Sequence, residues 1–163
     1  MTLNLQYEGG EKFMNIAFFL LPKSEVAWIS LESTMRQAIE ELEQHPYRAV
    51  PLVAGDGSYA GTLSEGDLLW ELKKRENLSL KNLENIPLEE VERHFEHETV
   101  SIYENIQALL SLALDQSFVP VVDDQGVFIG IVTRKAVIEF FAEEYMEEFD
   151  LKTAQQSNNN NND

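Results

Sequence analysis

Two short turns carry the residues of this sequence that could do chemistry. Ser64-Glu65-Gly66-Asp67 places a hydroxyl three positions before a carboxylate, and Thr133-Arg134-Lys135-Ala136 places a hydroxyl directly before two cations. The first pattern is that of a capping box at the start of a helix. A helix N-terminus also presents free N–H groups to an anion, and a nearby aspartate can accept from sugar hydroxyls. From these residues alone, a purely structural cap and a nucleotide site both stay open.

The cations of the second turn favour an anion site. The helix dipole disfavours a positive side chain in the first helical turn by roughly 0.3 kcal/mol or more. The chain has only 12 Lys and Arg against 29 Asp and Glu, yet Arg134 and Lys135 both stand at this position. A bound anion would explain the choice, and two solvated surface cations are the alternative.

Both turns belong to an internal repeat. Ala49-Val50-Pro51-Leu52-Val53 matches Phe118-Val119-Pro120-Val121-Val122 at a distance of 69 positions, and the glycines Gly61 and Gly130 keep the same spacing. A repeat of this length is normally a supersecondary unit that needs its twin to bury its apolar face. We therefore expect the function to reside in the pair.

Each copy predicts the order strand, helix, strand, strand, helix. In the first copy the strands are expected at 26–30, 47–53 and 59–63, and the helices after a capping box of Thr34 with Gln37 and over 65–74. In the second copy the strands are expected at 100–102, 119–122 and 127–132, and the helices around 106–113 and over 134–149. The first strands of the two copies align at a shift of 71 positions, as Ile29 with Val100, instead of 69. Pro87 suits the first turn of a helix in the linker between the copies.

Composition limits the class of protein. A chain of 163 residues with 44% apolar residues forms one domain or two small halves that share a core. It has no Cys, which excludes disulfides and thiolate chemistry, and its longest apolar run, 16–21, is too short to span a bilayer. The net charge of −17 argues against binding nucleic acid or anionic membranes. We expect a soluble cytoplasmic protein.

In these residues the chain resembles the CBS domain, named for cystathionine β-synthase. The marks are the apolar-Pro-apolar-apolar strand, the glycine that ends the hairpin, and the motif Gly-x-x-Ser/Thr-x-x-Asp. The segment from Gly61 to Asp67 matches the motif in full, whereas the second copy has Ala136 in place of the aspartate. The resemblance covers about 16–142. It implies an α/β (α+β) fold in which two tandem β-α-β-β-α repeats pack as a pseudo-twofold Bateman module and dimerise through their helices.

The resemblance is greatest to stand-alone bacterial CBS proteins that bind AMP-type nucleotides or cyclic di-AMP, and it implies two clefts between the repeats. The first cleft would comprise Val26, Ala27, Tyr47, Arg48 and Ala49 with Thr133, Arg134 and Lys135. The second cleft would comprise Ser64, Asp67 and Phe118. In the first cleft the small apolar residues would enclose an adenine, Tyr47 would stack on a base, and the three cations would meet phosphate. The second cleft lacks a cation pair, so we expect one strong site.

The sequence thus predicts a non-enzymatic regulatory sensor that binds AMP, ADP, ATP or cyclic di-AMP, forms a homodimer and signals to an unidentified partner protein. Neither a cofactor nor a metal is expected. One alternative is a ligand-free interaction module whose acidic surface docks a basic partner. A nucleotidase ranks lower, because no GxxxxGK, GxSxG or closely paired catalytic carboxylates are present.

The expected domain plan has five parts. Residues 1–13 form a non-native or disordered extension before a start at Met14, 14–76 the first repeat with an N-terminal helix, 77–98 a linker, 99–150 the second repeat with a C-terminal helix, and 151–163 a disordered tail. His94 and His97 would face each other across a helical turn. Two histidines at this spacing are a weak indication of a metal site, and a solvated acidic linker explains them better. The aromatic residues of 140–149 suggest a buried stripe or a contact surface.

Overall fold

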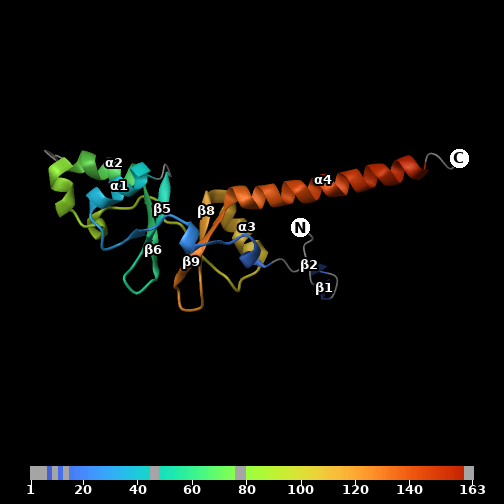
Figure 1. The fold of residues 1–163 in the computed structure, drawn as a ribbon, viewed down its shortest axis with the longest axis horizontal. Helices are drawn as coiled ribbons and strands as arrows, with labels where there is room; N and C mark the ends of the chain where they lie inside the picture. Colours follow the sequence, from blue (N-terminus) through green and yellow to red (C-terminus); the bar gives the residue numbers. More distant parts are fainter. Residues whose placement is uncertain (1–6, 9–10, 13–14, 45–47, 76–79, 160–163) are drawn as a thin grey trace.

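A computed structural model describes residues 7–8, 11–12, 15–44, 48–75 and 80–159, which form two similar halves followed by a long helix (Figure 1). The first half contains β4 (Ile29–Ser30), α1 (Met35–Gln44), β5 (Ala49–Val53), β6 (Tyr59–Ser64) and α2 (Glu65–Lys74). The second contains β7 (Val100–Ser101), α3 (Ile106–Asp115), β8 (Phe118–Val122), β9 (Phe128–Thr133) and α4 (Arg134–Asn159). The doubled β-α-β-β-α order predicted from the sequence is confirmed.

Short elements occupy the segments before and between the two halves. They are β1 (Tyr7–Glu8), β2 (Glu11–Lys12), η1 (Ile16–Phe18), β3 (Leu21–Pro22), η2 (Lys23–Glu25), η3 (Leu80–Asn85) and η4 (Leu88–Glu90), where η marks a 3₁₀ helix. Strands β1 and β2 pair with each other within the segment expected to be a non-native or disordered extension. The expected N-terminal helix and the linker helix after Pro87 are each a single 3₁₀ turn.

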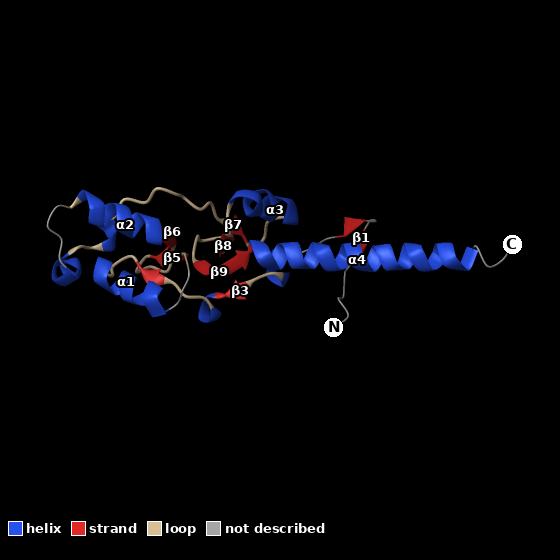
Figure 2. Cartoon of the chain, turned by 90° about the horizontal axis from the view of Figure 1, so that it is seen from above, coloured by secondary structure: helices blue, strands red, loops and turns tan. Residues whose placement is uncertain are grey.

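The two sheets lie side by side in the middle of the molecule, with α1 and α2 beyond one sheet and α3 and α4 beyond the other (Figures 1 and 2). Strand order is β4-β5-β6 in one sheet and β3-β9-β8-β7 in the other. The registers of the two hairpins correspond, since Ala49 pairs with Ser64 and Phe118 pairs with Thr133. A bridge between Ser58 and Val127 joins the two hairpins directly.

The chain segment before the first repeat belongs structurally to the second. Leu21 and Pro22 of β3 pair with Ile131 and Gly130 of β9. Ile16, fully buried, packs into the core of the second repeat. The domain plan counts 14–76 as the first repeat, and in the structure the apolar residues around η1 and β3 pack in the core of the second.

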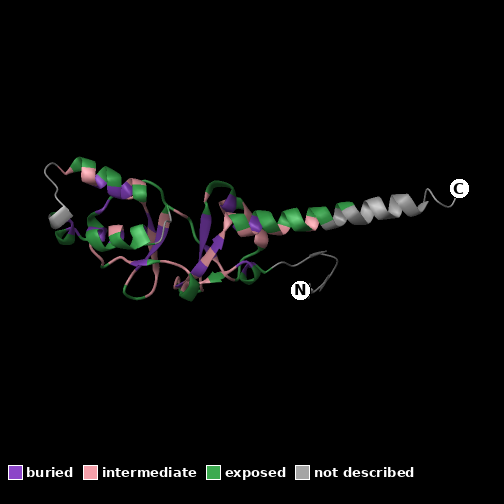
Figure 3. Cartoon of the chain, turned by 45° about the horizontal axis from the view of Figure 1, so that its top comes forward, coloured by how far each residue is buried: buried purple, intermediate pink, exposed green. Residues whose placement is uncertain are grey.

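Each half has its own apolar core (Figure 3). In the first, Met35, Leu52 and Leu63 are fully buried, and in the second, Leu109 and Val119 are. Burying a side chain of this size contributes about 1.5–3 kcal/mol each. The two cores explain why the apolar-Pro-apolar-apolar strands recur: β5 and β8 are the buried centre of each sheet.

The local signals for helix starts are confirmed at α1. Gln37 Oε1 accepts from Thr34 N at 2.9 Å, and Thr34 Oγ1 accepts from Gln37 N at 3.3 Å. These are the two reciprocal bonds of the predicted capping box. At α3 the side chain of Asn105 caps the helix instead, accepting from Ala108 N at 3.0 Å.

Helix α4 is longer than predicted. It was expected to end at 149, but it continues to Asn159, into the segment assigned to a disordered tail. The sequence has no Pro or Gly after Gly130, so nothing in it breaks the helix. At 1.5 Å per residue its 26 residues extend about 39 Å, and Figure 1 shows it projecting beyond the body.

The pairing of β3 with β9 predicts a sharp difference between two glycine variants. A methyl group at Gly130 would collide with the carbonyl oxygen of Leu21, whereas at Gly126 it would meet nothing within 4 Å and only a φ of +81° would be strained. We expect Gly130→Ala to lower the unfolding free energy by about 3 kcal/mol and Gly126→Ala by about 1 kcal/mol. Chemical denaturation would measure both, and equal losses would contradict the described strand pairing.

Candidate functional site

The turn at the start of α2 forms the predicted capping box. Ser64 Oγ accepts from Asp67 N at 3.2 Å, and Asp67 Oδ2 accepts from Ser64 N at 2.9 Å and from the Ser64 hydroxyl at 2.7 Å. The structural interpretation of this motif is therefore confirmed.

Asp67 also anchors the segment that leads into the second repeat. Its Oδ1 lies 2.9 Å from His94 N and 3.1 Å from His94 Nδ1, and the residue is 1% exposed. Burial raises the pKa of this carboxyl, but hydrogen bonds from Ser64 and His94 outweigh burial and leave the pKa below its ordinary value. In this arrangement a ribose hydroxyl would have to compete with His94 for the carboxylate.

His97 stacks on Phe118. The ring centroids are 4.8 Å apart at 22°, and Phe118 is buried. Nδ1 of His97 is buried and has no hydrogen-bond partner among the described residues. Burial lowers the pKa of this imidazole, so the structure holds it neutral.

The two histidines do not lie on a helix. The segment 91–99 has no regular secondary structure. Within it, His94 contacts Asp67 and His97 stacks on Phe118. This corrects the expectation of a helical turn in a solvated linker, because each imidazole has a structural partner. Within the described part of the chain, no cluster of three or more His, Asp or Glu could hold a metal ion.

Two cavities border this segment. The Arg93 cavity, of about 250 Å³, is lined by Tyr59, Ala60, Gly61, Thr62, Arg93, Phe95, Glu96 and His97. The Arg134 cavity, of about 440 Å³, is lined by Phe95, Glu96, His97, Glu98, Leu112, Asp115, Gln116, Ser117 and Arg134. In the first cavity the Tyr59 hydroxyl bonds Thr62 Oγ1 at 2.6 Å, and burial raises the pKa of Tyr59 to about 12.

The predicted cationic turn lies at the start of α4. Thr133 Oγ1 accepts from Ala136 N at 3.1 Å, so Thr133 caps the helix and its hydroxyl proton can still be donated. Arg134 Nε donates to the Gln116 carbonyl at 3.0 Å, which places this side chain at the Arg134 cavity. Lys135 is 82% exposed and pairs with Glu139 at 3.4 Å, a surface contact of little strength.

The other residues predicted for the first cleft come from the first repeat. Val26 and Ala27 are half-buried between η2 and β4, and Ala49 begins β5. Arg48 is exposed, and its carbonyl accepts from Glu65 N at 3.1 Å. Tyr47 lies outside the described residues. Contacts between η2 and β9 bring this side of the first repeat to the strand that ends at Thr133.

Basic side chains divide into two groups in this acidic chain. Among the described side chains, ion pairs hold Arg36, Lys74, Arg75 and Lys135. Lys23, Arg48, Lys73, Arg93 and Arg134 form no ion pair with a described carboxylate.

Two of these unpaired cations, Lys23 and Arg93, cross from one repeat to the other. Lys23, before the first repeat, lies 6.0 Å from the Phe128 ring of β9, and Arg93, before the second, lies against Gly61 of β6. Arg93 Nη1 is buried without a hydrogen-bond partner among the described residues. Sequence reasoning missed both. Lys23 matches His94, and Pro22 matches Arg93, at the same shift of 71 positions that relates Ile29 to Val100.

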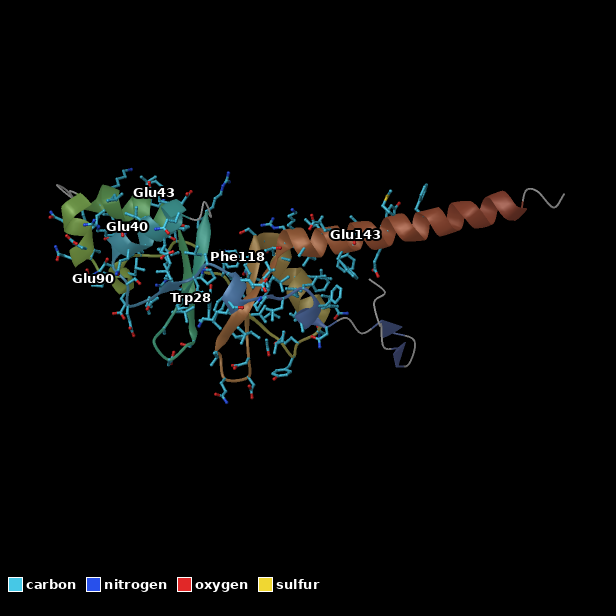
Figure 4. All side chains as sticks on the ribbon, in the orientation of Figure 1. Trp28, Glu40, Glu43, Glu90, Phe118 and Glu143 are labelled. Atoms are coloured by element: carbon cyan, nitrogen blue, oxygen red, sulfur yellow. The ribbon has the colours of Figure 1, made fainter. Side chains whose placement is uncertain are left out.

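Figure 4 labels acidic and aromatic side chains of the two halves. Glu40 and Glu43 on α1 and Glu143 on α4 lie on the outer helices, whereas Trp28 and Phe118 lie towards the junction of the halves. An anion would thus approach the junction between acidic outer surfaces. Among the described helices, none is long and apolar enough to cross a membrane.

The comparison with protein families matches the CBS domain over residues 20–74 and 84–143, more than half of the chain. The chain therefore belongs to the CBS domain family, as two tandem repeats. CBS domains are generally regulatory, non-catalytic modules. A comparison with curated protein sequences gave no match.

Solved structures share the fold. One is CbpB in complex with c-di-AMP, with a TM-score of 0.74 and 22% identity over 85% of this chain and 91% of that one. A CBS domain protein from Streptococcus pneumoniae TIGR4 has a TM-score of 0.70 and 26% identity over 79% and 87%. CbpB from Listeria monocytogenes in complex with c-di-AMP has a TM-score of 0.66 and 22% identity over 81% and 97%.

The buried imidazole of His97 predicts a pH dependence of stability. The folded state lowers its pKa, so between that value and the ordinary value of 6.5 the unfolded chain binds more protons. The stability from this group is complete above pH 6.5 and is lost as pH falls through the folded pKa. The unfolding temperature of the wild type should fall between pH 7.5 and pH 5.5. It should fall less in His97→Phe, a variant that keeps an aromatic ring against Phe118. Equal losses would show that His97 is not held neutral.

Proposed function

We propose that the chain is a regulatory module that binds an adenine nucleotide, AMP, ADP, ATP or cyclic di-AMP, in the first cleft between its CBS repeats. The observation that carries the proposal is the placement of unpaired cations in a chain of net charge −17. Lys23 and Arg93, which cross from one repeat to the other, and Arg134, at the start of α4, form no ion pair with a described carboxylate although carboxylates are abundant. The fold shared with CbpB structures that contain c-di-AMP supports the same class of ligand.

The second turn supplies the chemistry for a phosphate. Thr133 keeps a hydroxyl proton that it can donate. To contact a phosphate, Lys135 gives up only its weak surface ion pair with Glu139. Arg134 reaches a phosphate in the first cleft by releasing the Gln116 carbonyl, a neutral acceptor. A charge-assisted bond to phosphate is about twice as strong as a bond to such an acceptor. Val26, Ala27, Arg48 and Ala49 would contact the base and its phosphate from the first repeat, together with Tyr47.

The second cleft is the weaker candidate. His94 already occupies the Asp67 carboxylate, and Phe118 is covered by His97. Glu65 and Gly66 stand where Arg134 and Lys135 stand in the other copy. A single strong site per chain follows.

Signalling requires that the nucleotide bind two states of the module with different affinity. An exposed apolar stripe on α4 favours this helix as the contact with the regulated protein or with a second copy in a homodimer. Ile138 is 59% exposed, Tyr145 68% and Met146 58%. The alternative, an interaction module without a ligand whose acidic surface docks a basic partner, predicts salt-sensitive partner binding and no effect of nucleotide.

The double variant Arg134→Ala with Lys135→Ala tests the proposed site. We expect AMP, ATP or cyclic di-AMP to raise the unfolding temperature of the wild type, because a ligand that binds only the folded state stabilises it. The double variant should lose this increase.

The control is Lys73→Ala with Lys74→Ala, which removes two neighbouring cations from α2. It should keep the nucleotide effect. If nucleotide raises the unfolding temperature of the Arg134 and Lys135 variant as much as that of the wild type, the site lies elsewhere. If no nucleotide raises the unfolding temperature of the wild type, the ligand-free module is favoured.

A further inference from the structure

The Arg93 cavity is separate from the residues predicted for the two clefts. Its walls come from Tyr59 to Thr62 of β6 and from Arg93 and Phe95 to His97 of the segment before the second repeat. None of the described residues predicted for the first or the second cleft lines it. Its volume of about 250 Å³ lies below the ~300–1,000 Å³ of pockets that enclose a drug-sized molecule, and a nucleotide is of that size. The cavity therefore suits a small ion better than a whole nucleotide.

Arg93 brings a cation without a partner to this cavity. Its Nη1 is buried and has no hydrogen-bond partner among the described residues, and its side chain forms no ion pair with a described carboxylate. Glu96 also lines the cavity, but this residue is exposed. A buried donor without an acceptor costs about 1–3 kcal/mol, and a charged donor costs more. The guanidinium would therefore gain from an acceptor inside the cavity.

His97 adds a second unpartnered nitrogen to the same cavity. Its Nδ1 is buried without a hydrogen-bond partner among the described residues, while its ring stacks on Phe118. In the tautomer that carries the proton on Nδ1, a neutral imidazole donates a hydrogen bond from this atom. Among the described side chains that are not exposed, Arg93 Nη1 and His97 Nδ1 are the two buried polar atoms without a partner, and both residues line the Arg93 cavity.

Two hydroxyl groups of β6 supply a further donor. The Tyr59 hydroxyl and Thr62 Oγ1 lie 2.6 Å apart, and both residues line the cavity. Two hydroxyls carry two protons and their mutual hydrogen bond uses one, so the other proton can be donated. Gly61 lets the guanidinium lie against the strand, since a methyl group there would stand 3.2 Å from Arg93 Nε. A guanidinium fork with neutral donors beside it is suited to an oxyanion such as phosphate.

We propose that the Arg93 cavity binds a small oxyanion of the phosphate type. Arg93 supplies the charge, and His97 and the hydroxyl pair of Tyr59 and Thr62 supply further hydrogen bonds. This site goes beyond the proposed function, because it lies apart from the first cleft and takes an ion instead of a nucleotide. The anion would join β6 of the first repeat to the segment that leads into the second, and so stabilise the contact between the repeats.

Inorganic phosphate is the probe for this site. Phosphate stabilises folded proteins in general through its exclusion from their surface, so variants are compared in phosphate and in chloride at equal ionic strength. We expect phosphate to raise the unfolding temperature of the wild type more than that of Arg93→Met, which lacks the charge-assisted bonds. The affinity derived from the dependence on phosphate concentration should fall about tenfold or more. Arg36→Met removes an exposed guanidinium paired with Glu40 on α1, and this control should respond as the wild type does.

His97→Phe is a second variant that leaves Arg93 in place. It keeps an aromatic ring against Phe118 but removes Nδ1, so phosphate should stabilise it less than the wild type. A response equal to that of the wild type in both His97→Phe and Arg93→Met would show that the ion does not bind in this cavity.

The variant Arg134→Ala with Lys135→Ala separates this site from the first cleft. It should keep the phosphate effect and lose the nucleotide effect, whereas Arg93→Met should lose the phosphate effect and keep the nucleotide effect. A phosphate effect that disappears only in the Arg134 and Lys135 variant would overturn this inference and leave the proposed function in place. A wild type stabilised by phosphate through Arg93 but by no nucleotide would overturn the proposed function and support the inference.

Discussion

The pairing of β3 with β9 is the constraint on which the rest of the structure depends. Because Leu21 and Pro22 complete the sheet of the second repeat, the chain must cross the junction before it forms the first repeat. This crossing places η2, with Lys23, against β9 and carries the next residues, Val26 and Ala27, along the same junction. The close approach leaves no room for a side chain at Gly130. One backbone contact thus ties the two repeats together and fixes where the chain that carries Val26 and Ala27, residues predicted for the first cleft, enters the first repeat.

Much of the fold could be predicted from the sequence because its signals are local. Alternating and continuous apolar runs, the turn glycines and the capping pairs at Thr34 and Ser64 each act within a few residues. The crossing of β3 could not be predicted in this way, since its two residues find their partner more than a hundred positions later. The length of α4 was missed for a different reason: a polar composition suggested disorder where nothing breaks the helix.

The candidate site shows the same division. The turns at 64–67 and 133–136 carry their own signature, and the structure confirms their helix-capping bonds. The partner of the first turn, His94, comes from a segment outside the aligned repeat core, so the turn itself gives no sign of it. The two turns share one backbone but differ in their side chains. The first has a carboxylate held by a histidine, and the second has two cations and an alanine in place of the carboxylate.

The central claim is that this asymmetry leaves one strong nucleotide site per chain. Isothermal titration calorimetry of the unmodified chain with cyclic di-AMP, AMP and ATP measures the number of sites directly. The account predicts that at least one of these ligands binds with one strong site per chain. Two equivalent sites per chain, or no binding heat with any of the three over a range of temperatures, would contradict it.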